Sequence, residues 1–163
     1  MVTRSNVWGK LGIIAVFVAC VAFYMITLAT RTTVSVVKSS MCKNNIELLG
    51  RALIAYVEDN DGLMPPLGWD KKRSCPRWVA ALNDYRRMQV EEENIISYLK
   101  CPSDQSHDTV SYEINPSLSG RYLQDIPEKE RRHTAVLFEK CYRDSHWWVF
   151  YLDGQVKRTC KSP

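Results

Sequence analysis

Cysteine and histidine are the residues of this chain that could carry metal or redox chemistry, but their spacing matches no known signature. The six cysteines contain no C-x-x-C pair and no C-x-x-C-H, so structural zinc, thioredoxin-like exchange and c-type haem attachment lack their usual spacing. The histidines form no H-E-x-x-H, and G-x-S-x-G is also absent. We therefore predict no catalytic residue, no cofactor and no metal. The positions considered are Cys20, Cys42, Cys75, Cys101, Cys141, Cys160, His107, His133 and His146.

The acidic run Asp59, Asn60 and Asp61 offers oxygen ligands that suit Ca²⁺. It lacks the Gly-containing twelve-residue loop of an EF-hand. Asp and Asn are poor helix formers, and Gly62 with the prolines at 65 and 66 cannot continue a helix. This run therefore predicts the end of a helix rather than a calcium site.

Five cysteines beyond Cys20 in a small domain indicate one or two disulfides and an oxidising compartment. The odd number leaves one thiol unpaired or bound to another chain. Strand order restricts the pairing, because Cys141 and Cys160 would lie on the two strands that flank a central strand. Two strand spacings of about 4.8 Å exceed the usual disulfide Cα separation. A bond between these two cysteines would make that strand order wrong.

An apolar segment near the N-terminus predicts a membrane anchor for the rest of the chain. Residues 11–30 are uncharged and lie between Lys10 and Arg31, and at 1.5 Å per residue they span a hydrocarbon core of about 30 Å. A cleaved signal peptide is the alternative, but its apolar region is normally shorter. We expect an N-terminal tail over residues 1–10, a single transmembrane helix over 11–30 and a soluble domain over 31–163.

The net charge of +4 is concentrated near this segment. Residues 1–43 carry five basic side chains and no acid, whereas the remaining 120 residues carry 17 basic and 18 acidic side chains. Basic residues beside a span suit lipid headgroups, and no nucleic-acid footprint remains. The expected partners are therefore the lipid bilayer, through residues 11–30, and an integral membrane protein complex, with no nucleic acid and no small-molecule substrate. Basic residues lie on both sides of the span, so charge alone does not decide its orientation.

An amphipathic helix is predicted over residues 41–59, continuing the transmembrane helix. Ile46, Leu49, Leu53 and Tyr56 repeat at spacings of three and four, which places them on one helical face. Gly50 costs a helix about 1 kcal/mol relative to Ala unless close packing requires it.

The pattern of the C-terminal part predicts a second helix, followed by a meander of strands over residues 134–159. Trp78, Ala81, Leu82 and Tyr85 share one face of a helix at 77–85. Strands are expected at 134–142 and 147–152, the second apolar on both faces as a central strand should be. The dipeptide at 153–154, Asp-Gly, predicts a two-residue type I′ hairpin, which would place position 160 opposite position 147.

Tryptophans supply candidate partner contacts, because this residue is enriched in binding hot spots. Trp147 and Trp148 are adjacent in one predicted strand, so they point to opposite faces of the sheet. The helix covers one face, and a partner protein is a candidate cover for the other. Trp69 is the third candidate.

Three segments in this order resemble the prepilin-type processing-associated proteins, whose C-terminal motif runs from a His to Asp-Gly. They are "CKNNIELLGRALIAYVEDNDGLMPP", "LKCPSD" and "YEINPSLSG…VLFE…FYLDGQVK", within residues 41–158. These proteins are pilin-like relatives of the type II secretion pseudopilins. The resemblance implies a pilin-like α+β fold, with a long N-terminal helix, transmembrane and then amphipathic, packed on a small antiparallel sheet. It also implies a Cys42–Cys101 disulfide, because both cysteines belong to the matching segments; Cys75 is the remaining candidate and has no assigned partner.

The N-terminus departs from the prepilin pattern of a Gly–Phe cleavage site followed by Glu at the fifth position. The fifth residues after Gly9 and Gly12 are Ile14 and Phe17, and the first acid of the chain is Glu47. The terminal motif is also shorter, with six residues between His and Asp where the family has nine. We expect a pilin-like domain on an unprocessed anchor.

The resulting functional hypothesis is a non-enzymatic structural subunit of the pseudopilin or secretion-apparatus type. It would be a single-pass protein of the bacterial inner membrane with its domain on the periplasmic side. The alternative is an accessory subunit of another membrane-embedded complex, respiratory or photosynthetic, that has reused the pilin-like fold.

Overall fold

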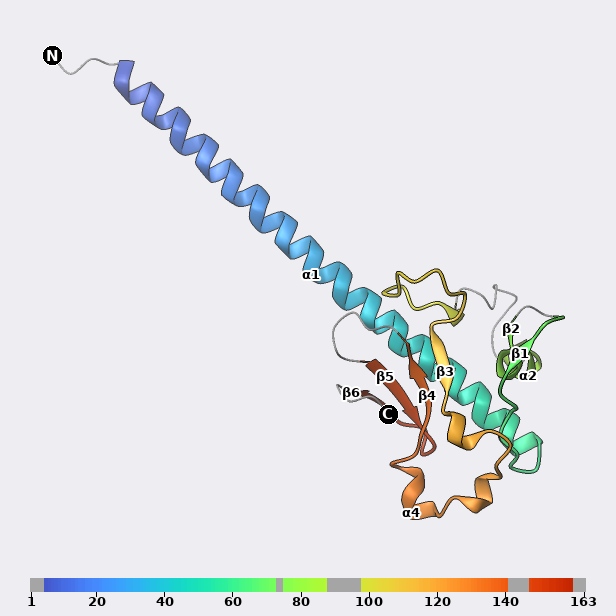
Figure 1. Ribbon diagram of the computed structural model, residues 1–163. Helices are drawn as coiled ribbons and strands as arrows, with labels where there is room; N and C mark the ends of the chain where they lie inside the picture. The colour runs from blue at the N-terminus through green and yellow to red at the C-terminus, as the bar shows by residue number, and fades with distance from the viewer. Residues whose placement is uncertain (1–4, 73–74, 88–97, 141–146, 160–163) are drawn as a thin grey trace. The chain divides into compact units, whose positions relative to one another are not determined.

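A computed structural model describes residues 5–72, 75–87, 98–140 and 147–159 (Figure 1). The chain divides into two compact units, Met1–Val37 and Lys38–Pro163. The fold is α+β, with one long N-terminal helix and a small antiparallel sheet. The predicted fold class is confirmed at this level.

Helix α1 runs from Ser5 to Asp59 over 55 residues, as the predicted joining of the two helical segments requires. Its middle is rich in β-branched and polar residues, which are weak helix formers. The threonine hydroxyl groups donate hydrogen bonds to backbone carbonyls of the preceding turn. Thr30 donates to the Thr27 carbonyl at 3.0 Å, and Thr33 donates to the Ala29 carbonyl at 2.8 Å. This back-bonding gives the hydroxyl groups a hydrogen-bond partner inside the helix, although it slightly destabilises a helix rather than strengthening it.

The turn after α1 confirms that the acidic run ends the helix. The Gly62 N–H donates to the Val57 carbonyl at 2.8 Å, and the Asn60 amide group donates to the Tyr56 carbonyl at 2.8 Å. Asp61 and Gly62 have φ of 54° and 84°, the left-handed conformation that closes helix C-termini.

The main sheet lies in the second unit and has the order β3-β4-β5-β6, with every neighbouring pair antiparallel. Its strands are β3 (Tyr112–Ile114), β4 (Ala135–Glu139), β5 (Trp147–Tyr151) and β6 (Val156–Thr159). From Lys38 onward, α1 lies against this sheet (Figure 1). The buried apolar face predicted for α1, including Ile46, Leu49 and Leu53, joins the strands in one core.

Smaller elements complete the second unit. A two-stranded sheet of β1 (Trp69–Asp70) and β2 (Cys75–Pro76) precedes α2 (Arg77–Arg87). The predicted helix at 77–85 is confirmed, and Trp78 and Leu82 are buried as expected, whereas Ala81 is half-buried. The side chain of residue 85 lies outside the described part. The 3₁₀ helices η1 (Pro116–Leu118) and η2 (Leu123–Asp125) and the short helix α4 (Glu128–Arg131) connect β3 to β4.

The predicted type I′ hairpin between β5 and β6 is wrong by one residue. Trp147 pairs with Thr159 rather than with position 160. The Gly154 N–H donates to the Tyr151 carbonyl at 2.9 Å, and the loop has three residues, with only its Gly in the left-handed region at φ 80°. This is a type I turn followed by a left-handed residue. The third loop residue allows Leu152 to be buried while its N–H bonds to the Thr134 carbonyl at 3.1 Å.

The order of the last three strands is confirmed, because β5 lies between β4 and β6. In the β4–β5 pairing, Phe138 lies opposite Val149 and Leu137 lies opposite Phe150. An irregularity between Ala135 and Leu137 accompanies this pairing. Positions 141, 146 and 160, with two cysteines and one histidine, lie outside the described residues.

Candidate functional site

A disulfide joins helix α1 to the loop that precedes the main sheet. Cys42 of α1 and Cys101 are bonded, with Cα atoms 4.9 Å apart and a sequence separation of 59. Both are fully buried. The pairing implied by the family resemblance is thus confirmed, and Cys75 is excluded as the partner of either. A cross-link that closes a loop of this length stabilises a fold by about 4 kcal/mol in the chain-entropy model.

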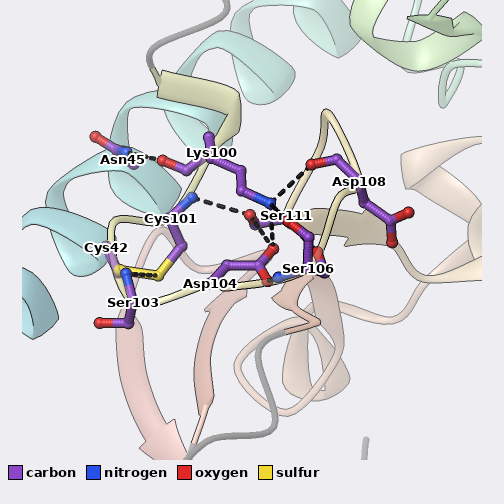
Figure 2. A network of polar contacts seen from close by, with 9 residues as sticks. All are labelled: Cys42, Asn45, Lys100, Cys101, Ser103, Asp104, Ser106, Asp108 and Ser111. Atoms are coloured by element: carbon purple, nitrogen blue, oxygen red, sulfur yellow. Dashed lines mark hydrogen bonds and ion pairs between the residues drawn. A yellow bond between two sulfur atoms is a disulfide. The ribbon is translucent and has the colours of Figure 1, made fainter.

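The loop after Cys101 folds around a lysine ammonium group (Figure 2). The Lys100 Nζ atom donates to the Asp104 carboxylate at 3.1 Å, to the Ser106 carbonyl at 2.8 Å and to the Asp108 carbonyl at 2.7 Å. One half-buried ammonium group thereby links three residues of the loop. The Asp104 N–H also donates to the Cys101 carbonyl at 2.9 Å, which closes a turn over residues 101–104.

Asp104 connects this lysine to the disulfide. Its carboxylate accepts the Ser111 hydroxyl at 2.5 Å, and the Ser111 oxygen accepts the Cys101 N–H at 3.0 Å. Burial alone would raise the pKa of Asp104, but hydrogen bonds from Ser111, Ser106 and Lys100 outweigh it and lower the pKa from 3.8 to about 2. Asp104 is therefore a stably ionised anchor of the loop.

Glu139, the last residue of β4, is buried beside the disulfide. An oxygen of its carboxylate and the sulfur atoms of Cys42 and Cys101 all lie within 4.8 Å of one another. Burial is the largest cause that raises the pKa of Glu139 from 4.5 to about 7; a hydrogen bond from the Trp148 N–H opposes the shift, the charge of Asp104 adds to it, and Arg158 opposes it. The site thus combines two sulfurs with a carboxyl group that exchanges its proton near neutral pH.

This cluster is the one group of three or more His, Cys, Asp or Glu side chains with ligand spacing in the described part of the chain. Metal ligation by cysteine requires the thiolate. In the disulfide state the two sulfurs are not thiolates, so the cluster is a redox pair with an adjacent carboxyl group. His107 and His133 are exposed and do not belong to it.

The sequence prediction of site residues missed Lys100, Asp104 and Glu139. A signal for Glu139 was present in "VLFE", because alternation along a strand places Glu139 on the same face as the buried Leu137. Nothing local marks Lys100 and Asp104, whose roles depend on a loop that closes over eleven residues.

The three tryptophan candidates differ in their surroundings. Trp69 is exposed, whereas Trp147 and Trp148 are half-buried. The Trp148 indole donates to the Ser39 hydroxyl at 3.4 Å, and the Lys43 ammonium lies 5.7 Å from its ring centroid. Helix α1 of the same chain therefore engages Trp148, as expected for the covered face of the sheet. Partner contact by Trp69, Trp147 and Trp148 stays a prediction.

Within the described residues, one helix, α1, is long and apolar enough to cross a membrane. The mean hydropathy of its apolar window is 2.5, and none of that window is buried. Large apolar side chains such as Ile13, Phe17 and Phe23 are exposed there. This exposure suits lipid rather than water.

Comparison with known proteins gave no match to a family model, a curated protein or a solved structure.

Proposed function

We propose that this protein is a non-enzymatic structural subunit with a pilin-like extracytoplasmic domain, anchored in the bacterial inner membrane by residues 11–30. The observation that carries the proposal is that the two parts of α1 have different surroundings. Its first part exposes a continuous apolar surface, and its residues from Cys42 onward supply the core of the α+β domain. An anchor and a fold core built from one helix suit a scaffold subunit.

The disulfide supports the extracytoplasmic side. Buried structural disulfides form and persist in oxidising compartments, such as the bacterial periplasm. The cross-link at Cys42 lies twelve residues beyond the end of the apolar segment at position 30. A domain tied in this way would be exported with its C-terminal part across the membrane.

We place the subunit among the pseudopilin or secretion-apparatus proteins, where lateral assembly would use the exposed apolar face of α1. The alternative, an accessory subunit of a respiratory or photosynthetic complex, is favoured by one observation. No acidic residue precedes Glu47, so the membrane part lacks the carboxylate that prepilins use for contact between subunits.

Extraction of native membranes in mild detergent, followed by a native gel and mass spectrometry, separates the two. Co-migration with a secretion ATPase, a platform protein or other pseudopilins supports the first function. Co-migration with a complex that carries pigment or redox cofactors supports the alternative. Migration as a single uncomplexed chain, together with an enzymatic activity of the purified protein, would contradict both.

A matched pair of variants sharpens the result. Trp69→Ala removes an exposed side chain outside the main sheet, and Trp148→Ala removes a side chain engaged by α1. If Trp69 contacts the partner, its variant leaves the complex while the domain stays folded. Trp148→Ala lowers the stability of the domain itself.

A further inference from the structure

The carboxyl group of Glu139 is buried. It accepts the Trp148 N–H at 3.3 Å, and no salt bridge within the described residues reaches it. Isolating a carboxylate from water in this way costs the fold free energy. The sulfur atoms of Cys42 and Cys101 lie within 4.8 Å of a Glu139 carboxyl oxygen. They are the neighbours that could exchange a proton with this group when they are thiols.

We propose that Glu139 is a built-in general base that takes the proton from one of these two thiols as the Cys42–Cys101 disulfide forms. Thiol–disulfide exchange proceeds by attack of a thiolate. Burial in apolar surroundings raises the pKa of a thiol, so buried cysteines supply few thiolates near pH 7. A carboxylate beside both sulfur atoms can accept the thiol proton and so produce the thiolate that the reaction needs.

The reaction consumes one small disulfide oxidant, such as oxidised glutathione. In the first exchange, one protein thiol loses its proton to water and its thiolate attacks a sulfur of the oxidant. The S–S bond of the oxidant breaks, a mixed disulfide forms, and the glutathione thiolate leaves and takes up a proton from water. In the second exchange, the other protein thiol passes its proton to Glu139, and the resulting thiolate attacks the protein sulfur of the mixed disulfide. The protein S–S bond forms, the bond to the oxidant breaks, and the leaving thiolate recovers the proton from Glu139. Two thiols are oxidised, one oxidant disulfide is reduced to two thiols, and Glu139 is regenerated.

The charges around Glu139 suit this role. Burial raises its pKa to about 7, Asp104 from the loop raises it further, and Arg158 from β6 opposes the shift. From α1, Lys43 lies over the Trp148 ring, and from β3 the Tyr112 hydroxyl donates to the Cys42 carbonyl at 3.3 Å. A general base works best when its pKa lies near the working pH, which is the case here.

The test measures formation of the Cys42–Cys101 disulfide, which closes a ring in the chain. It uses the full chain, purified in mild detergent, with the other four cysteines replaced by serine. Reduced protein is mixed with excess oxidised glutathione between pH 6 and 9, quenched with acid, alkylated and weighed by intact mass spectrometry. The mixed disulfide and the closed ring differ in mass, so the second exchange is followed directly. The variants are Glu139→Gln, Glu139→Asp and, as a carboxylate control on the neighbouring strand, Glu113→Gln, which loses only a half-exposed contact to Lys140.

At pH 7 we expect Glu139→Gln to close at least about tenfold more slowly than the parent. The parent rate should rise through a titration near pH 7 and then level off, whereas the rate of the Gln variant should still be rising at pH values above the ordinary thiol pKa of about 8.5, because its buried thiols lack the base. Glu139→Asp should recover part of the rate, and Glu113→Gln should match the parent. The proposal is overturned if the Gln variant closes as fast as the parent with the same pH profile, or if Asp is as slow as Gln. Circular dichroism of each oxidised variant identifies any variant that fails to fold, in which case the Asp variant and the parent pH profile decide.

Discussion

Gly50 of α1 faces the ring of Phe150 in β5 so closely that a Cβ atom at position 50 would lie 2.3 Å from the ring carbon Cδ2. The two residues are one hundred positions apart in sequence, and their contact sets how near the helix approaches the sheet. Glycine at this position is therefore a packing requirement, which overrides its unfavourable helix propensity.

Gly50→Ala should destabilise the domain by about 1–3 kcal/mol, because overpacking against the ring exceeds the gain in helix propensity. Gly12→Ala is the matched control in the same helix, since nothing lies within 4 Å of its added methyl group. Denaturant unfolding of the full chain in detergent measures both. If the contact is the cause, combining Gly50→Ala with Phe150→Leu should cost less than the sum of the two single changes. Additive costs would show that the methyl group and the ring do not compete for space.

Replacing Cys42 and Cys101 together by serine should lower the free energy of unfolding by about 4 kcal/mol. Removing both avoids leaving one buried thiol that could pair wrongly. Cys20→Ser, at an exposed position of α1, is the control and should change little. Thermal unfolding with and without a reductant provides a second measurement: the reductant should lower the midpoint of the parent but not that of the double variant.

The buried carboxyl of Glu139 should make the oxidised protein less stable as the pH rises. Its folded pKa of about 7 lies above the ordinary value of 4.5, so between these values the folded state binds the proton more tightly than the unfolded state. The contribution of Glu139 is fully present below pH 4.5 and is lost as the pH passes through 7, a change of about 3 kcal/mol.

Glu139→Gln should remove this dependence and be more stable than the parent at pH 8, while the two converge below pH 4.5. Urea unfolding of oxidised protein across this range measures it. Because the disulfide stays closed throughout, the result is independent of the rate of disulfide formation. Parallel stability curves for the parent and the Gln variant would show that the group titrates alike in both states.

Asp104→Asn should destabilise the loop by about 2 kcal/mol at pH 7. The folded pKa of about 2 lies below the ordinary 3.8, so this stabilisation is present above pH 3.8 and is lost as the pH falls toward 2. Asp108→Asn is the matched control, because residue 108 contacts Lys100 through its backbone carbonyl, which the change keeps. Unfolding midpoints at pH 7 and pH 3 compare the two. An equal loss in both variants would mean that the Asp104 carboxylate has no special part in holding Lys100.

Patterns confined to a few neighbouring residues predicted the local structure well. The periodicity of Ile46, Leu49 and Leu53 identified the buried face of α1, and the run 59–62 identified its end. The hairpin prediction was wrong, although it too rested on neighbouring residues. The dipeptide Asp-Gly is compatible both with a two-residue type I′ loop and with a three-residue loop that ends in a left-handed Gly. In the observed three-residue loop Leu152 is buried, a tertiary contact that the dipeptide does not reveal.

By itself, the sequence determined the long apolar helix, its amphipathic continuation, the α+β class and, through the family resemblance, the disulfide. These follow from short-range spacing and from residue types that impose backbone conformation. Only the tertiary structure decided why residue 50 is glycine, why Glu139 holds its proton near pH 7, and that Lys100 and Asp104 support Cys101. Packing distances and pKa values depend on atoms brought together from distant parts of the chain, and no local pattern contains that information.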